Sequence, residues 1–421
     1  MAQQKTLVVI GAGAAGVFCA VNAARLHPHL QVIILEKTDK VLSKVKISGG
    51  GRCNVTHACF SIADMVKKYP RGGSFLKKAF HQFFTTDTIE WFAQRGIALK
   101  TEPDGRMFPQ SNLSQTVIDC LLSEAQKYKV QIRLKTAVNR IEKNEDGTFQ
   151  LHTPAAVIEA NAVCIACGGF PKAAHFDWLT QLGHSIASPV PSLFTFNIPQ
   201  HPITALMGIS VPHAVLRLGG TKLQQEGPLL ITHWGLSGPA ALKLSAWAAR
   251  ELATQQYECK LLVNWLPGEH EQSILERFQR IRFDLAAQKI INRNPFALPS
   301  RLWEYFLQAC GINDAIRWAD LPAKEQNKLA KILCNQEFSV KGKTTFKEEF
   351  VTAGGITLSE IDVNTMQSKL VPGLFFAGEI LDIDGVTGGF NFQNAWTTGW
   401  IAAKNVNLEV SVPGKKQSNA I

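Results

Sequence analysis

The spacing of apolar positions changes twice along the chain, and each spacing predicts a different kind of element. Near the N-terminus, the apolar runs 7–10 and 31–35 flank a helical pattern over 14–26, which is typical of buried parallel strands joined by a helix. From Leu193 onward apolar residues recur at every second position, which predicts a small antiparallel β domain. The expected short strands are 193–198, 211–218, 222–225 and 229–231. Residues 269–331 then show helical spacing, and the apolar run 374–377 predicts a return to the first domain.

The first apolar run leads directly into a turn with the spacing G-x-G-x-x-G. The motif consists of Gly11, Ala12, Gly13, Ala14, Ala15 and Gly16. Gly11 permits a tight turn, Gly13 lets a pyrophosphate approach the backbone, and Gly16 lets the next helix pack on the strand. The free N–H groups at the start of that helix favour phosphates. The motif predicts dinucleotide binding, and the alternative is a glycine-rich turn in an ordinary α/β unit.

An acidic residue follows the second strand at the distance expected for a ribose ligand. Glu36 ends the run 31–35, about 20 residues after the last glycine of the motif. A carboxylate there accepts hydrogen bonds from ribose hydroxyls and repels a 2′-phosphate, so the site favours FAD or NAD over NADP. The adjoining Lys37 is included in the predicted cofactor site.

A second glycine-rich segment, 49–54, has the sequence Gly-Gly-Gly-Arg-Cys-Asn. Its glycines, with Gly50 at their centre, can adopt positive φ and bring backbone N–H groups close to a ligand. Arg52 offers a planar donor fork to a pyrophosphate or an anionic flavin edge, and Asn54 offers an amide to a flavin ring. Cys53 is either a reactive thiol near the flavin or an inert buried one. The alternative for the whole segment is a surface loop.

A third apolar run, 162–166, also ends in glycines, which returns the chain to the cofactor-binding edge of the sheet. The residues predicted to contact the cofactor there are Ala166, Cys167 and Gly168. Cys164 and Cys167 point to opposite faces of an extended strand, so we do not expect them to form a dithiol centre. Val138 is placed beside the adenine by analogy only.

The closing segment, 374–395, predicts a second cofactor-binding edge. Its candidate ligands are Gly378, Glu379, Asp384, Gly389, Phe390, Asn391 and Gln393. The acids either bind ribityl hydroxyls or support the turn. A helix that begins near Phe390 presents its N–H groups to a flavin pyrimidine edge, where its dipole stabilises the negative charge that reduction develops. NAD has no ring that needs a second edge, so this segment favours FAD.

His233 is the candidate catalytic residue, because it ends a strand of the β domain immediately before a Gly/Ser/Pro turn. It is predicted to donate a proton or bind substrate over a flavin. The alternative is a histidine with a purely structural role.

Composition narrows the class of protein without deciding its substrate. The 421 residues are too many for one core, and the nine cysteines lack a framework spacing, which suits reduced thiols in a cytoplasm. No signal peptide, membrane span or metal site is predicted. The net charge of +10 admits an anionic partner, but the chain has no dense basic block apart from Lys415-Lys416, so nucleic acid is the less favoured partner. The oligomeric state is left open.

Taken together, these motifs resemble the BaiN/YhiN-like family of FAD-dependent oxidoreductases. The resemblance rests on 11–16 with Glu36, on 46–54, on 232–239 and on 352–395. It implies an α/β fold with a discontinuous Rossmann-like FAD-binding domain, an inserted β-barrel-like domain and a helical insert. The expected parts are 1–192 and 348–421 for the FAD-binding domain, 193–266 and 334–347 for the β-barrel-like domain, and 267–333 for the helical insert. Activities attributed to such relatives include reduction of steroid-like enones and oxidation of small amino ketones.

The sequence therefore predicts an FAD-dependent oxidoreductase that moves a hydride between flavin N5 and a small organic substrate. No second G-x-G-x-x-G is present, so NAD(P)H is either a transient electron donor or not the donor. One alternative is a flavin-bearing RNA-modifying or RNA-binding protein, which the basic charge motivates. Another is a redox sensor that uses Cys53 or Cys167.

Overall fold

A computed structural model describes residues 4–344, 351–406 and 408. The chain divides into two compact units: unit 1 is Met1–Val190 with Val351–Ile421, and unit 2 is Pro191–Phe350. The predicted re-entry at 348 and the pair Lys415-Lys416 lie outside the described residues.

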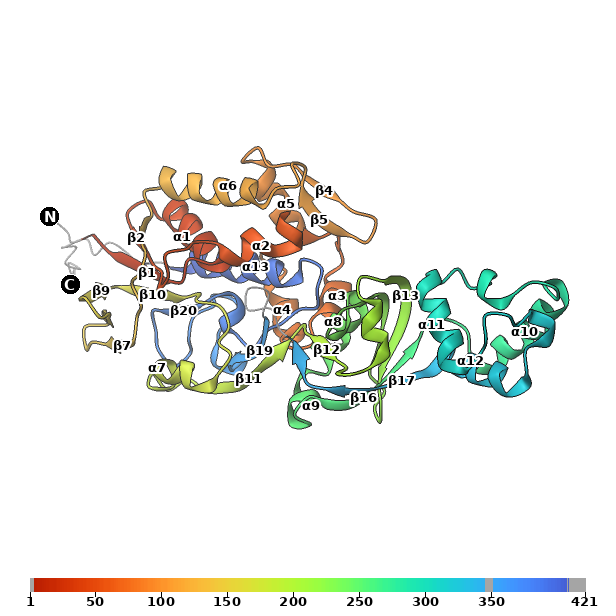
Figure 1. Ribbon diagram of the computed structural model, residues 1–421. Coiled ribbons are helices and arrows are strands. Elements are labelled where there is room, and N and C mark those ends of the chain that lie inside the picture. Colours follow the sequence, from red (N-terminus) through yellow and green to blue (C-terminus); the bar gives the residue numbers. More distant parts are fainter. Residues whose placement is uncertain (1–3, 345–350, 407, 409–421) are drawn as a thin grey trace, which may run out of the picture. The chain divides into compact units, whose positions relative to one another are not determined.

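Unit 1 combines a parallel sheet, several helices and three smaller sheets (Figure 1). Its strands are β1 (Thr6–Ile10), β2 (Gln31–Leu35), β3 (Thr56–His57), β4 (Leu99–Thr101), β5 (Arg106–Pro109), β6 (Gln131–Arg133), β7 (Arg140–Lys143), β8 (Phe149–His152), β9 (Val157–Ala160), β10 (Ala162–Ile165), β11 (Ile186–Ser192, whose last two residues belong to unit 2), β19 (Val351–Ile356) and β20 (Leu374–Phe376). Its α-helices are α1 (Ala14–Leu26), α2 (Ser43–Gly51), α3 (Ile62–Met65), α4 (Gly73–Ala79), α5 (Thr85–Ala93), α6 (Ser114–Lys127), α7 (Asp177–Thr180) and α13 (Phe390–Asn405).

The central sheet of unit 1 has the strand order β20-β10-β1-β2-β6, and every neighbouring pair is parallel. The register places Leu7 opposite both Ala162 and Val32. The apolar runs predicted from the sequence form the middle strands because residues buried on both faces of a sheet must all be apolar. The strand from the C-terminal part, β20, thus joins the same sheet as the first strand of the chain, which confirms the predicted mixed α/β class.

Helices α1 and α13 lie side by side in unit 1 (Figure 1). Phe18 of α1 packs against Trp396 of α13 and against Trp91 of α5, with ring centroids 5.1 and 4.6 Å apart. Gly399 lets the two helices approach, because a Cβ built on it would lie 2.9 Å from the carbonyl oxygen of Ala15. Phe80, Phe83, Phe84 and Trp91 are also buried in unit 1.

Unit 2 contains a seven-stranded antiparallel sheet with the order β17-β16-β13-β14-β15-β12-β18. Its elements are β12 (Thr195–Asn197), β13 (Ser210–Leu218), β14 (Gln224–Ile231), β15 (Gly235–Ser237), α8 (Pro239–Trp247), α9 (Ala249–Thr254), β16 (Glu258–Asn264), α10 (Glu271–Asp284), α11 (Ser300–Cys310), α12 (Ala323–Asn335), β17 (Gln336–Lys341) and β18 (Lys343–Thr344). The predicted strands 222–225 and 229–231 are a single strand, β14, because Gly227 continues the chain in an extended form at φ +149°.

The first and last strands of this sheet, β17 and β18, are separated by Gly342 alone. Gly342 donates its N–H to Tyr257 O at 2.9 Å and accepts from Asn197 N at 3.2 Å, so one residue connects the two edges. The sheet therefore curls toward a barrel. Helices α10, α11 and α12 share its hydrophobic core, in which Trp265 packs 5.6 Å from Phe306.

Within the described residues, no helix combines the length and apolarity needed to cross a bilayer.

Replacing Gly399 by Val is expected to lower the free energy of unfolding of unit 1 by about 1–3 kcal/mol beyond any change in helix propensity, because the branched side chain meets backbone of α1. The matched control is Lys404→Val, at an exposed position of the same helix, which carries a propensity cost of roughly 0.7 kcal/mol without the clash. Urea unfolding at fixed flavin content measures both variants. Equal losses would show that the α1–α13 approach is not constrained.

Candidate cofactor-binding and active site

The turn after β1 is shaped by two glycines whose side chains would collide with backbone. Gly11 has φ +107°, and a Cβ there would lie 2.6 Å from Ala166 O of the turn after β10. A Cβ on Gly16 would lie 2.0 Å from Gly11 O. These contacts confirm the structural part of the fingerprint prediction: Gly11 makes the tight turn and Gly16 brings α1 close to the strand.

The N-terminus of α1 is left open to a ligand. Gly13 is the N-cap, no side chain caps the helix, and a Cβ on Gly13 would meet no atom within 4 Å. The first-turn N–H groups, which begin at Ala14 and Ala15, have no carbonyl partner within the helix. This end of the helix fits a pyrophosphate.

Glu36 lies at the end of β2 and reaches back to the glycine turn. Its Oε2 accepts from Ala12 N at 2.9 Å, and its Oε1 accepts from Thr38 N and Oγ1 at 2.9 and 2.8 Å. The Ala12 N–H is therefore committed to Glu36 rather than to phosphate. The chain before Val138 runs alongside, since Thr136 N donates to Glu36 O at 2.8 Å.

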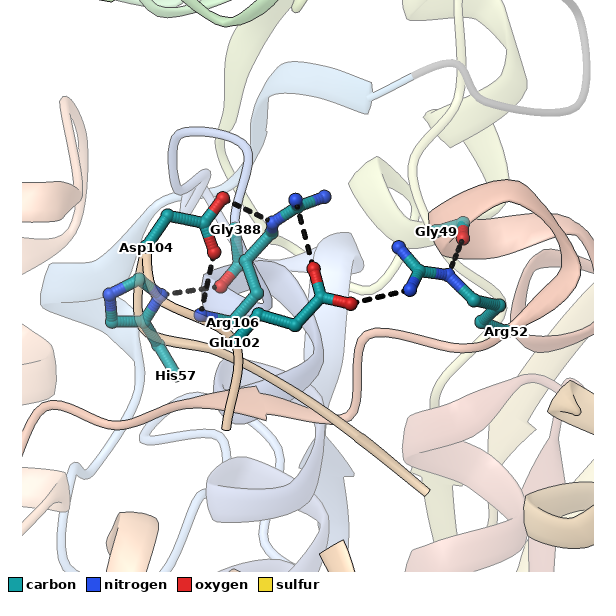
Figure 2. A network of polar contacts seen from close by, with 7 residues as sticks. All are labelled: Gly49, Arg52, His57, Glu102, Asp104, Arg106 and Gly388. Atoms are coloured by element: carbon teal, nitrogen blue, oxygen red, sulfur yellow. Dashed lines mark hydrogen bonds and ion pairs between the residues drawn. The ribbon is translucent and has the colours of Figure 1, made fainter. Parts of the chain in front are cut away.

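The glycine segment at the end of α2 adopts the predicted positive φ: 59° at Gly49, 69° at Gly50 and 82° at Gly51. Arg52, however, forms an ion pair with Glu102 in the β4–β5 hairpin, with Nη1 and Oε1 2.5 Å apart (Figure 2). Its guanidinium also stacks 4.0 Å from the Phe108 ring. The guanidinium predicted to meet the pyrophosphate is thus held by protein partners.

Asn54 is the side chain that best indicates a missing partner. It is 7 % exposed, and its Oδ1 has no hydrogen-bond partner among the described residues. An unpaired buried carbonyl oxygen costs free energy, so a ligand donor is expected there. This observation, with the open end of α1, shows that the residues present fit an FAD molecule.

The candidate redox cysteines are neutral thiols. Cys53 is fully buried, and burial raises the pKa of its thiol to about 12. Burial also raises the pKa of Cys167 to about 12. The sulfur nearest to Cys164 is that of Cys19, at 3.6 Å, and all nine cysteines are free.

At the end of β20, Glu379 holds two parts of unit 1 together. Its carboxylate accepts from Lys44 Nζ at 2.6 Å and from Thr352 N at 2.9 Å. Gly168 lies nearby, because a Cβ on it would be 3.8 Å from Glu379 Oε2.

Two other predicted ligands also contact the protein. Gly378 donates its N–H to Thr398 Oγ1 at 2.8 Å. Lys37 lies over the Phe170 ring at 5.5 Å.

Three predicted ligands use their side chains within the protein. Asp384 is fully buried and paired with Arg71 through both carboxylate oxygens. Asn391 bonds the N–H and carbonyl of Gly385, and Gln393 accepts from Thr56 Oγ1 at 2.6 Å. Of the two roles open to Asp384, the geometry favours support of the turn, because the side chain is enclosed by partners.

The N-terminus of α13, like that of α1, has no side-chain cap. Gly389, at φ +96°, is its N-cap without a side-chain cap, and a Cβ there would lie 2.5 Å from Thr56 O. His57 stacks on Phe390 at 4.6 Å and bonds Gly388 O through Nδ1 at 2.9 Å (Figure 2). The closing segment therefore meets the first 60 residues, as the FAD hypothesis requires.

Sequence reasoning missed the residues that fix this helix end. They are His57, Tyr69 and Arg71, of which Tyr69 donates its hydroxyl to Phe390 O at 2.7 Å. The only sequence signal for such a role was the short spacing of His57 from Asn54. The partners of His57, Tyr69 and Arg71 lie more than 300 positions later in the chain.

His233 lies in unit 2, exposed, at the turn between β14 and β15 beside the Trp234 ring. Thr232 closes that turn by accepting from Gly235 N. The catalytic role of His233 stays a prediction. A polar cavity of about 670 Å³, lined by Arg25 of α1, by residues 94–97 after α5 and by residues of α6, includes none of the predicted ligands.

The model of the HI0933-like protein Rossmann domain matches residues 5–405. The chain belongs to this family. It is 30% identical over 409 residues to an Escherichia coli protein named ribosomal RNA dihydrouridine synthase, covering 95% of this chain and 97% of that one. It is 27% identical over 413 residues to a Clostridium scindens 3-dehydro-bile acid delta(4,6)-reductase, covering 94% and 97%. The predicted resemblance is confirmed.

Solved structures agree with this fold. A 3-ketosteroid-Δ4-(5α)-dehydrogenase from Rhodococcus jostii superimposes with a TM-score of 0.51 at 14% identity, over 95% of this chain and 97% of that one. A flavocytochrome c3 fumarate reductase gives 0.50 at 16% identity, over 96% and 78%. The chain is an FAD-dependent oxidoreductase of the HI0933-like family.

Gly13→Ala is expected to weaken FAD binding at least tenfold while leaving the fold intact, because the added methyl group meets only the space in front of α1. Its backbone angles, φ −83° and ψ −172°, suit alanine. Flavin titration and thermal unfolding of the flavin-free protein measure the two effects. Unchanged affinity would remove the α1 N-terminus from the site.

Native Cys53 is expected to react with iodoacetamide at pH 8 roughly a thousandfold more slowly than in urea, because a thiol with a raised pKa carries little thiolate. The raised pKa also means that this residue's contribution to stability is present below about pH 9 and is lost as pH rises toward 12. Peptide mass spectrometry measures the labelling of Cys53 and Cys167. Rapid native labelling of either would favour the redox-sensor alternative.

Proposed function

We propose that this protein reduces the carbon–carbon double bond of an α,β-unsaturated carbonyl group, and that its substrate is a uridine in ribosomal RNA. Support comes from two curated relatives, from Escherichia coli and Haemophilus influenzae, that are 30% and 29% identical over nearly full length and carry the name ribosomal RNA dihydrouridine synthase. The net charge of +10 suits a polyanionic substrate.

The bond class accommodates the third relative as well. In uracil the C5=C6 double bond is conjugated with the C4 carbonyl, and the name 3-dehydro-bile acid delta(4,6)-reductase describes a double-bond system near a 3-keto group. Reduction of either substrate adds a hydride to the carbon far from the carbonyl and a proton to its neighbour. The same reaction, reduction of a double bond conjugated with a carbonyl group, therefore fits the printed names of both kinds of relative.

The protein's own groups have separable tasks in this proposal. The N–H groups at the start of α1 bind pyrophosphate, and Glu36 accepts from ribose hydroxyls. The N-terminus of α13 stabilises negative charge near Gly389, where no side chain caps the helix. Bound FAD supplies the hydride, and NAD(P)H is the proposed source of its electrons. His233 is the proposed proton donor.

The observation that carries the flavin part of this proposal is that α1 and α13 both begin without a side-chain cap, with α1 proposed for the phosphate end and α13 for the ring end. A ribosomal RNA substrate places the protein in the cytoplasm with the ribosome. The steroid-like substrate is the second candidate, favoured by the 27% identity to the bile acid reductase.

The holoenzyme is expected to be yellow and, with NADH or NADPH under anaerobic conditions, to convert uridine to dihydrouridine in ribosomal RNA that lacks the modification. Nucleoside mass spectrometry detects the gain of two hydrogens, and a parallel assay offers a 3-keto-4,6-diene steroid. Conversion of the steroid alone would select the second candidate. A colourless protein that takes up no FAD would contradict the proposal, and Glu36→Ala should weaken FAD retention.

A further inference from the structure

The segment between β3 and α5, residues 60–81, is a basic stretch of unit 1 whose exposed lysines are not used by the cofactor site. It contains five Lys or Arg residues and one acid, Asp64. The exposed cations are Lys67, Lys68, Lys77 and Lys78. The closing part of unit 1, residues 351–406, has the opposite balance, with two basic and five acidic residues. The segment is therefore the basic partner of an acidic closing part.

The lysines are carried by two short helices that pack on each other. Lys67 and Lys68 end the 3₁₀ helix η1 (Val66–Lys68), and a Cβ on Gly73, the first residue of α4, would lie 2.9 Å from Val66 O. On α4 the helical spacing puts Lys77 and Lys78 on the exposed side, opposite the buried Leu76 and Ala79.

This segment is fastened to the loop that leads into α13. Val386 N donates to Lys68 O at 2.9 Å, and Tyr69 donates to Phe390 O at 2.7 Å. Arg71 forms the buried ion pair with Asp384. The basic segment therefore borders the helix end at which the reducible ring is proposed to bind.

An exposed aromatic side chain begins the segment. Phe60 is 60 % exposed and lies directly before the N-cap of α3. Lysines that neutralise phosphates, together with an aromatic ring on which a base can stack, form the usual surface for single-stranded nucleic acid. A membrane surface fits less well, because the apolar side of α4 is buried in the protein and cannot insert into lipid.

We propose that residues 60–81 bind the phosphate backbone of the RNA substrate and present the target uridine beside α13. This inference rests on the proposed function. The four exposed lysines make the phosphate contacts, and Phe60 stacks on a base that flanks the target. The ion pair of Arg71 with Asp384 positions the surface and does not itself contact RNA.

The test compares two variants with the same change of charge. In one, Lys67, Lys68, Lys77 and Lys78 are replaced by Gln. In the control, the exposed lysines Lys289, Lys324, Lys328 and Lys331 of unit 2 are replaced by Gln. Each variant is titrated into a fluorescein-labelled single-stranded RNA of mixed sequence. Fluorescence anisotropy measures the dissociation constant at a series of KCl concentrations.

The segment variant is expected to bind the RNA at least tenfold more weakly, with a salt slope reduced by about 2–3, since each single-strand phosphate contact contributes about 0.7. The control should keep the wild-type slope, and both variants should keep wild-type FAD content and melting temperature. Phe60→Ala should weaken binding without changing the slope, because stacking releases no counterions.

Three outcomes separate the two proposals. If wild-type protein reduces ribosomal RNA uridine and the segment variant binds RNA like wild type, the inference about the segment is overturned and the proposed function stands. If wild-type protein neither binds RNA nor reduces uridine, the proposed function fails and the segment loses its partner. If wild-type protein binds phosphatidylserine vesicles and not RNA, residues 60–81 bind a membrane surface and the inference is wrong.

Discussion

The close approach of backbone to backbone at the carboxyl edge of the parallel sheet is the constraint on which unit 1 depends. Gly11 touches the turn after β10, and Gly16 touches Gly11, so three elements meet where any side chain would separate them. Gly399 repeats this arrangement between α1 and α13. Because the elements are in direct contact, the N-termini of α1 and α13 are held in a fixed relation.

The local part of this arrangement could be predicted from the sequence. The strand of 7–10, the glycines after it and the positive φ of 49–51 follow from residue types at short spacing, because glycine is the residue that tolerates such backbone positions. The return of the chain through β20 could also be predicted, since an apolar run that ends in glycine has few other places to lie.

The partners of charged side chains could not be predicted in the same way. Arg52 meets Glu102, and Arg71 meets Asp384, 313 positions later. Each pair depends on how separate segments pack, which no periodicity encodes. The same reason explains Cys164: its neighbour in space is Cys19 on α1, whereas the sequence offered only Cys167. The glycine motifs and the family resemblance together predict an FAD site. The structure shows which side chains of that site already have protein partners.

The chain leaves unit 1 along β11 and comes back along β19, and these two strands pair with each other. Thr357 N also donates to Ser185 O at 3.0 Å, just outside the pair. The exit and entry points of the inserted unit are thus neighbours. A segment attached in this way can be lengthened, shortened or exchanged during evolution without loss of the cofactor half. One scaffold of this kind can therefore carry inserted units that differ in size and in the residues they present.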